Sequence, residues 1–435
     1  MAAAGDLSPS VLEAFGRAFD AREVATLRRL FGEHPAARAS IDLPHFPFDS
    51  PAIVHFAGSA DVALIDLLLD LGADPNRRSD WWAGGFHALH HARGAVAERL
   101  LEAGAVPDAC AAAQLDLPAL LRAMLAESPA RVHERGGDGQ TPLHFARSRE
   151  VVDILLDHGA DIDALDVDHR ATPAQWMLDH RRDAGRFALA RYLVERGASV
   201  DVFLAAALGL TDRLRELLEA DPSLIEQRTG RGAYREQPPS SFHIYTWTIG
   251  PHLSPLQVAG QFEQDEALEL LRALAAPKDR FLAACAQGHA QEATRLLAER
   301  PGLLAELGLD ERRILPDAGW AGHAAAVDLM LSLGFDASAR GQDGGTVLHC
   351  AAWQGAARCV EAALQHESVR AIIESRDLVH DSTPLGWCCH GARHCRNRAG
   401  DYPGVARLLL AAGARPGPNL SDAPDEVLAV IRARA

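Results

Sequence analysis

The clearest hydrophobic pattern of the chain lies at residues 138–164, DGQTPLHFARSREVVDILLDHGADIDA. Apolar side chains form a wide stripe over residues 151–158, which predicts an amphipathic helix, and Gly159 follows as its C-terminal cap. A shorter helix is predicted just before it, because Thr141 can cap a helix and Pro142 then takes the first helical position, where its missing N–H costs nothing. Two helices this short cannot bury the stripe alone, so the pattern predicts neighbouring copies of the unit.

The helix-pair pattern recurs with variations along nearly the whole chain, and it predicts about twelve units. The first copy, at residues 11–42, and a last helix at residues 421–435 match weakly. We expect them to cap the two ends, since an end unit must face water. The recurrence predicts an all-α solenoid of stacked helix pairs rather than several globular domains.

The unit at residues 138–164 resembles one ankyrin repeat, in which Thr141-Pro142-Leu143-His144 opens the first helix and Gly159-Ala160-Asp161 closes the second. The resemblance covers nearly the whole chain, with specific motifs in four or five units. It implies helix pairs joined by finger hairpins turned to one side. The insertions are similar to those of a group of bacterial ankyrin-repeat proteins, although that similarity assigns no activity. Ankyrin arrays are scaffolds, and surface residues set the ligand.

Long insertions divide this array. Residues 227–253 break the period, and their segment 242–249 alternates and is rich in aromatic and β-branched residues, which predicts a hairpin strand. We therefore divide the chain into an N-terminal array at 1–226, the insertion at 227–253, and a C-terminal array with its capping helix at 254–435. A further insertion at 391–404 separates the helices of the last repeat.

Charge and composition narrow the class of partner. The chain of 435 residues carries 59 acidic against 43 basic side chains, for a net charge of -16. This disfavours nucleic acid and anionic membranes as partners. Lys278 is the only lysine, so a P-loop lysine is absent, and the abundant arginine and alanine indicate a GC-rich bacterial genome.

Compartment signals point to the cytoplasm. The seven cysteines show no framework spacing, and most fall at packing positions, which favours buried thiols in a reducing compartment. The first fifteen residues, MAAAGDLSPSVLEAF, lack the basic and apolar regions of a secretory signal, and no apolar run is long enough to span a membrane. We therefore expect a cytoplasmic protein.

Candidate metal and catalytic residues favour structural roles. The histidine of the opening motif recurs as His55, His90, His144 and His349. The resemblance implies that this imidazole bridges the threonine hydroxyl and backbone groups of the adjoining unit. The acids Asp161, Asp163, Asp166 and Asp168 resemble a calcium loop but lack its sixth-position glycine and distal glutamate.

The densest set of possible metal ligands is Cys388, Cys389, His390, His394 and Cys395, whose adjacent cysteines fit zinc spacing poorly. No HExxH, GxSxG, GxxxxGK[ST] or GxGxxG motif occurs. We predict no catalytic residue, no metal and no cofactor, although a site assembled from separate repeats would escape this search.

Aromatic side chains carry the functional prediction. Trp320 and Trp353 are 33 residues apart, one ankyrin period, and each follows two small packing residues. His390 takes the same place in the next unit, so these three residues are predicted to line the concave groove. Trp82 lies in the finger at 77–86 and Trp247 in the long insertion. An exposed aromatic cluster there would mark a binding surface.

The sequence therefore predicts a non-enzymatic scaffold that binds a protein or peptide in its groove and along its fingers. A competing hypothesis remains open: an enzyme or small-molecule binder whose groove pocket is closed by the insertions at 227–253 and 391–404. The sequence leaves the oligomeric state undetermined.

Overall fold

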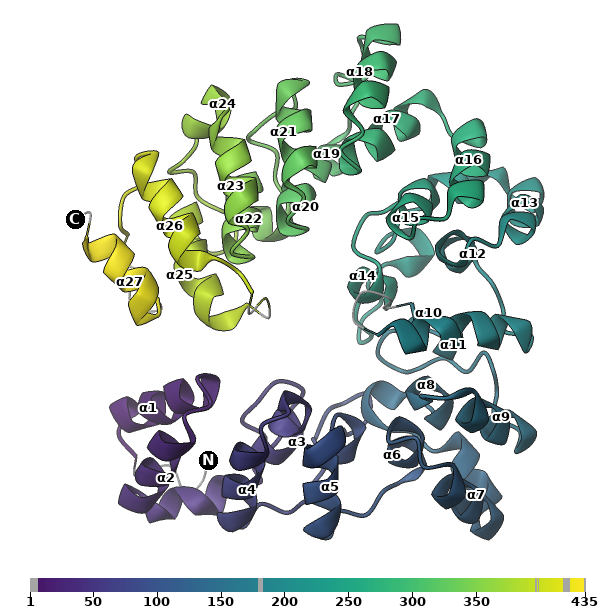
Figure 1. The fold of residues 1–435 in the computed structure, drawn as a ribbon, viewed down its shortest axis with the longest axis vertical. Helices are drawn as coiled ribbons and strands as arrows, with labels where there is room; N and C mark the ends of the chain where they lie inside the picture. Colours follow the sequence, from purple (N-terminus) through teal and green to yellow (C-terminus); the bar gives the residue numbers. More distant parts are fainter. Residues whose placement is uncertain (1–6, 179–182, 396, 398, 418–422, 434–435) are drawn as a thin grey trace. The chain divides into compact units, whose positions relative to one another are not determined.

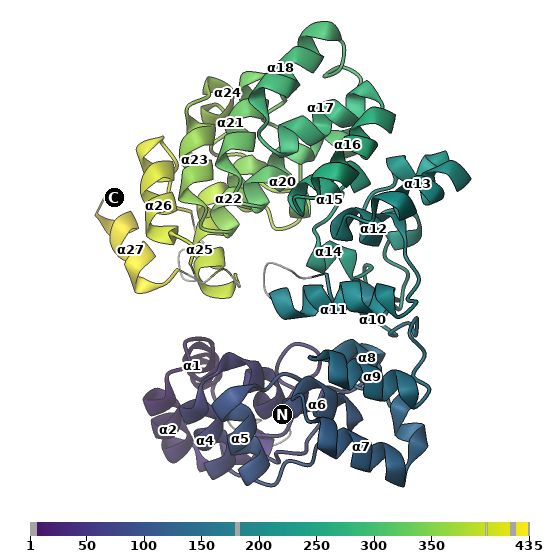
Figure 2. The ribbon, with the colours of Figure 1, turned by 45° about the vertical axis from the view of Figure 1, so that its right-hand side comes forward.

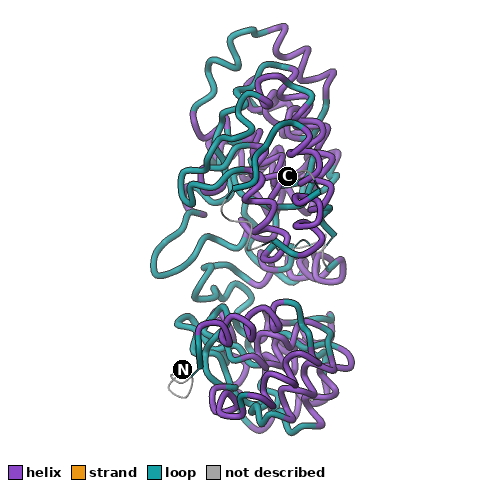
Figure 3. The backbone as a smooth tube through the Cα atoms, turned by 90° about the vertical axis from the view of Figure 1, so that its left-hand side faces the viewer, coloured by secondary structure: helices purple, strands orange, loops and turns teal. Residues whose placement is uncertain are grey.

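The computed structural model describes residues 7–178, 183–395, 397, 399–417 and 423–433. The chain forms two compact units, Met1–Val258 and Ala259–Ala435. Helices alternate with loops throughout the described chain (Figure 3). Backbone pairing of the β type is limited there to the isolated bridges Phe46–Ser50, Arg78–His87 and Gln237–Ser240. The all-α prediction is confirmed, and the expected finger hairpins reduce to these bridges.

The first unit contains short helices that alternate with longer ones (Figure 1). Its helices are α1 (Pro9–Asp20), α2 (Val24–Glu33), α3 (Ala52–Phe56), α4 (Val62–Asp70), α5 (Gly94–Glu102), α6 (Ala109–Gln114), α7 (Pro118–Glu127), α8 (Pro142–Phe145), α9 (Arg149–Asp157), α10 (Pro173–Trp176), α11 (Ala184–Glu195), α12 (Val202–Leu208), α13 (Thr211–Ala220) and α14 (Tyr245–Thr248). Helix α15 (Pro255–Gln261) crosses the boundary between the units.

The described part of the second unit also consists of helices joined by loops (Figure 2). Its helices are α16 (Asp265–Leu274), α17 (Pro277–Ala286), α18 (Ala290–Glu299), α19 (Leu309–Arg312), α20 (Ile314–Trp320), α21 (Ala324–Ser332), α22 (Val347–Trp353), α23 (Ala357–Leu364), α24 (Glu367–Arg370), α25 (Pro384–His394), α26 (Tyr402–Ala411) and α27 (Asp425–Arg432). Helix α27 lies within the predicted capping segment, whose residues 421, 422, 434 and 435 fall outside the described chain. No described helix in either unit is long and apolar enough to cross a membrane.

Side-chain caps start many of these helices. The Ser148 hydroxyl accepts a hydrogen bond from the Val151 N–H at the start of α9, and Thr383 accepts one from the Gly386 N–H at the start of α25. Such caps satisfy backbone N–H groups that have no partner inside the helix. Pro142 and Pro384 each stand in the first turn that follows a threonine.

Each unit builds its core between neighbouring helix pairs. In the second unit, α20, α22 and α25 pack as one row, and α21, α23 and α26 pack as another (Figures 1 and 2). Apolar side chains from both rows merge into one buried cluster that runs from Phe281 to Ile431. The stripe of one pair is thus covered by the next pair, as the periodicity predicts.

The long insertion does not form the predicted strand. Residues 245–248 make the single turn α14, in which the Thr248 N–H donates to the Ile244 carbonyl at 3.0 Å. Tyr245 is fully buried, and its hydroxyl donates to the Asp201 carboxylate at 2.9 Å. This anchored side chain fixes the turn, and no described segment pairs with it as a second strand. The hairpin prediction for 242–249 was therefore wrong.

Candidate functional site

Two motif histidines hold adjoining repeats together. The Thr141 N–H donates to His144 Nδ1 at 3.0 Å, so the ring proton sits on Nε2, which donates to the Ala171 carbonyl at 3.1 Å. His349 repeats this arrangement, with its Nε2 3.0 Å from the carbonyl oxygen of Ser382. Burial lowers the pKa of His144 to about 3 and of His349 to about 4, so both rings are neutral near pH 7. The structural interpretation is confirmed for these two residues.

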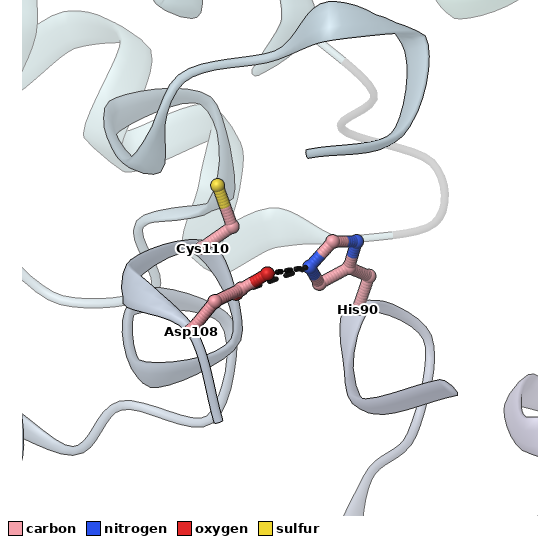
Figure 4. A group of neighbouring side chains, drawn as sticks. All are labelled: His90, Asp108 and Cys110. Atoms are coloured by element: carbon pink, nitrogen blue, oxygen red, sulfur yellow. Dashed lines mark hydrogen bonds and ion pairs between the residues drawn. The ribbon is translucent and has the colours of Figure 1, made fainter. Parts of the chain in front are cut away.

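His90 uses a carboxylate where His144 uses a backbone carbonyl. His90 Nε2 lies 3.0 Å from the Asp108 carboxylate, and Cys110 stands beside them (Figure 4). Burial alone would raise the pKa of Asp108, but hydrogen bonds from His90, the Ala111 N–H and Arg78 hold it well below its usual range. Burial also raises the pKa of the Cys110 thiol. An acid already paired with Arg78 and hydrogen-bonded to His90, beside a protonated thiol, fits a structural network rather than a metal site.

The structural interpretation of the sequence does not hold for the remaining motif histidine, His55, but it holds for the cysteines. His55 is exposed and stacks on Phe46 with ring centroids 4.9 Å apart, so the buried motif position does not extend to it. All seven cysteines are buried and free, as expected for packing residues. Burial raises the pKa of the Cys388 thiol, which suppresses its reactivity.

The predicted groove residues lie together in the second unit. Trp320 ends α20 and Trp353 ends α22, and their rings stack with centroids 6.4 Å apart and planes 11° apart. His390 of α25 continues the row, 5.6 Å from Trp353, and His394 follows 4.3 Å beyond it. We call Trp320, Trp353 and His390 the aromatic row. Trp387 is buried and meets Trp353 edge-on at 6.1 Å.

Glycines allow this stacking because they let the helix backbones approach closely. A Cβ on Gly319 would lie 2.8 Å from the Val347 carbonyl oxygen, and one on Gly391 would lie 2.6 Å from the Trp353 carbonyl oxygen. Both contacts are too short for any side chain. Gly319 is one of the two small packing residues noted before Trp320 in the sequence, whereas Gly391, which follows His390, was not used in the sequence prediction.

The aromatic row is partly anchored in the core. Trp320 and Trp353 are half-buried and pack against the main apolar cluster, whereas His390 is exposed. From sequence, truncation of Trp353 is expected to leave folding almost unchanged. The structure argues against this expectation, because the Trp353 ring contacts the indoles of both Trp320 and Trp387.

The other two predicted binding residues lie in the first unit. Trp82 is 45% exposed in its finger, beside Trp81 at a ring distance of 6.1 Å. Trp247 is 59% exposed on α14. Both indoles are therefore accessible, and neither belongs to the aromatic row.

A polar pocket of about 210 Å³ lies in the first unit against the long insertion. Its lining residues are His169, Arg170, Gln175, Asp201, Ala233, Tyr234, Arg235, Gln237, Ser241 and His243. The Asp201 carboxylate caps α12 and accepts hydrogen bonds from Tyr234, Tyr245 and Gln175 at 3.1, 2.9 and 2.8 Å. Sequence reasoning missed this network, since the only signal was a pair of tyrosines in an insertion.

Burial sets the protonation of the groups around this pocket. It lowers the pKa of His243 to about 3 and raises the pKa of Asp201, and it raises the pKa of Tyr234 well above its usual range. His243 is therefore neutral and Tyr234 remains a hydrogen-bond donor.

The acids of the calcium-like run separate in the structure. Asp166 accepts backbone N–H groups of His169 and Ala171 at 2.8 and 2.6 Å, and Asp163 accepts the Ser199 N–H at 2.9 Å, as finger-turn acids do. Asp168, which is buried like Asp166, differs in lying beside Asp138 and His169. Burial, followed by the nearby Asp168 charge, raises the pKa of Asp138 to about 7, against an opposing effect of His169.

Comparison with protein-family models agrees with this architecture over part of the chain. Residues 109–204, from α6 to the start of α12, match the family model for ankyrin repeats in three copies. Residues 109–204 therefore consist of ankyrin repeats, and helix pairs also occur outside that range. The crystal structure of the ankyrin repeat domain of Bcl-3, a member of the IkappaB protein family, is similar at 18% identity and a TM-score of 0.32; the match covers 54% of this chain and 98% of that one. Comparison with curated proteins gives no match.

Proposed function

We propose that the protein binds a protein or peptide through the aromatic row of the second unit. The ring contacts of Trp320, Trp353 and His390 across three consecutive repeats support this proposal. Core packing explains buried tryptophan, but it does not require a half-buried tryptophan at the same place in successive repeats. Ankyrin repeats are in general protein-binding scaffolds.

The mechanism is preorganisation. The rings are held by packing and by their neighbours, so a partner meets an ordered surface and little side-chain entropy is lost on binding. Aromatic anchors of this kind dominate binding energy in many interfaces. Trp82 and Trp247 supply exposed indoles on the first unit as further contacts for the same or another partner.

The test compares Trp353→Ala with Leu309→Ala in the full chain. Leu309 is 86% exposed in the same unit and lies outside the aromatic row, so it controls for the loss of any exposed apolar group. Partners are captured from a peptide library displayed against the intact protein, and affinities are measured by calorimetry. Loss of one anchor should cost about 2 kcal/mol, roughly a 30-fold weaker Kd.

Two outcomes would contradict the proposal. One is a folded Trp353→Ala protein that binds with unchanged affinity, which would make Trp82 and Trp247 the better candidates. The other is equal weakening by Leu309→Ala, which would indicate nonspecific apolar adsorption. Trp353→Phe should retain part of the affinity, because it keeps an aromatic face in the row.

A second candidate function rests on the polar pocket of the first unit. Arg170 and Arg235 line it, are exposed, and form no ion pair within the described chain. Two free guanidinium groups favour an anion. The volume of about 210 Å³ is below that of usual ligand pockets, about 300–1,000 Å³, so a small dicarboxylate fits better than a nucleotide.

Thermal shift against a panel of small carboxylates tests the pocket. A saturable stabilisation that disappears in the Arg170→Ala, Arg235→Ala double variant would support it. No saturable shift with any dicarboxylate would exclude this ligand class. With Asp201 committed to hydrogen bonds, the pocket favours binding rather than catalysis.

A further inference from the structure

Three ligand-type side chains converge where two fingers of the first unit meet the long insertion. Asp138 belongs to the finger before α8, and Asp168 and His169 belong to the finger before α10. One ligand atom from each lies within 4.8 Å of the others. Asp138 is 6% exposed and Asp168 1% exposed, so water does not freely solvate these carboxylates.

Each of the two carboxylates has one oxygen that receives no hydrogen bond from the described residues. Asp138 accepts one hydrogen bond, from Trp81 Nε1 to its Oδ1 at 3.0 Å, and Asp168 Oδ1 accepts the Ser241 N–H at 3.0 Å. The second oxygen of each carboxylate accepts no hydrogen bond within the described chain. His169 Nε2 lies 3.6 Å from Asp168 Oδ2, which is too far for a hydrogen bond.

The histidine tautomer adds a third acceptor. His169 Nδ1 lies 2.8 Å from the Phe242 carbonyl oxygen, which can only accept, so Nδ1 carries the proton. In the neutral ring, Nε2 then presents its lone pair to Asp168. An imidazole oriented by a backbone carbonyl in this way is the usual arrangement behind a metal-bound histidine. Two carboxylates and this nitrogen together favour a positively charged occupant, since buried uncompensated charge costs several kcal/mol.

The second unit provides an internal comparison. Counted back from the threonine before α22 or α25, Asp343 and His380 occupy the positions of Asp138 and His169, and Asp343 Oδ2 lies 3.6 Å from His380 Nε2. There the pair is largely exposed, and Val379 stands where the first unit has Asp168. The third ligand and the burial are thus particular to the first unit, where insertion residues cover the junction.

We propose that Asp138, Asp168 and His169 form a binding site for a divalent transition-metal ion, with zinc the favoured occupant. Carboxylate oxygen and imidazole nitrogen suit zinc, and three protein ligands leave a position for water or a ligand atom. Because Ser241 and Phe242 hold Asp168 and His169, the ion would fasten the insertion to the fingers. His169 also lines the polar pocket, so metal binding would stiffen one wall of it.

Calorimetric titration of zinc into the full chain, purified without an affinity tag and stripped with a chelator, tests the site. The expected result is one ion per chain, with protection of residues 227–253 from proteolysis when zinc is bound. Asp168→Asn and His169→Gln should each weaken binding about 100-fold or more. Asp168→Val, which copies the second unit, should abolish it. His380→Ala, in the equivalent exposed pair, should leave binding unchanged.

Each other outcome would overturn the proposal. One is the absence of saturable zinc binding. In that case, a single proton would balance the charge of the Asp138 and Asp168 carboxylates. Another is zinc binding that survives Asp168→Asn and is lost on Cys389→Ser, which would place the ion at the cysteine and histidine set of α25. Variants are compared only after circular dichroism shows native helix content, and the two conservative changes guard against misfolding by Asp168→Val. Manganese run in parallel distinguishes the metal class.

Discussion

Replacing His144 with alanine tests the structural role of the motif histidines most directly. The imidazole is 1% exposed and serves two backbone groups, the Thr141 N–H and the Ala171 carbonyl, at 3.0 and 3.1 Å. His144→Ala leaves both groups buried without this partner. Each such group costs about 1–3 kcal/mol, so we expect a loss of about 3 kcal/mol in the free energy of unfolding at pH 7. That is a large fraction of the stability of an ordinary domain, about 5–15 kcal/mol.

Lowering the pH should reduce the difference in the free energy of unfolding between the unchanged protein and His144→Ala. The pKa of His144 is about 3 in the folded protein against 6.5 for the free side chain, so the unfolded chain binds more protons between these values. The contribution of the neutral ring is therefore complete above about pH 6.5 and is lost as the pH falls towards 3. At pH 5 the loss is about 2 kcal/mol. The alanine variant has no such loss, so its deficit should fall from about 3 to about 1 kcal/mol.

Urea denaturation followed by circular dichroism at pH 7 and pH 5 measures both values. His133→Ala is the matched control, because His133 is exposed in the same unit and should change stability by less than about 0.5 kcal/mol. An unchanged unfolding midpoint for His144→Ala, with binding lost, would refute the structural reasoning. A deficit that is equal at both pH values would refute the assignment of a neutral, buried ring.

Two further predictions concern packing. Gly391→Ala should lower stability by about 1–3 kcal/mol and weaken the exciton coupling of the stacked indoles in circular dichroism, because its Cβ would meet the Trp353 carbonyl oxygen at 2.6 Å. Gly32→Ala, in a helix with open space around it, should instead stabilise by about 0.5–1 kcal/mol; equal effects from both changes would contradict the close-approach argument. Tyr245→Phe removes a hydrogen bond to Asp201 and should make residues 227–253 more sensitive to limited proteolysis, at a cost of about 1–2 kcal/mol. Unchanged cleavage rates would show that Tyr245 does not anchor the insertion.

Part of the candidate site was accessible to sequence reasoning because repeats have a fixed period. The spacing of 33 residues between Trp320 and Trp353 predicted equivalent positions, and the rings do stack. The extent of burial was not accessible, because it depends on how closely α20, α22 and α25 approach one another. Gly319 and Gly391 control that approach, and small residues in a sequence do not reveal how close the neighbouring helix comes.

The sequence by itself determined the helix pairs, their caps and their stacking, since these follow from local periodicity and from the need of each apolar stripe for a neighbour. It also determined the bridging role of His144 and His349, because the partners of each lie in the same motif and the next unit. Only the tertiary structure decided the conformation of the long insertion. Its residues 242–249 have a strand-like alternation, yet the burial of Tyr245 against Asp201 selects a helical turn.

Contacts with the long insertion also determine the cluster of Asp138, Asp168 and His169. Asp138, Asp168 and His169 belong to two adjoining fingers, and each resembles an ordinary turn residue in the sequence. Their burial depends on cover from Ser241 and Phe242, about seventy residues further along. Interactions between residues so far apart in the chain leave no periodic signal, so the sequence supplies the ligands and only the folded structure brings them within 4.8 Å.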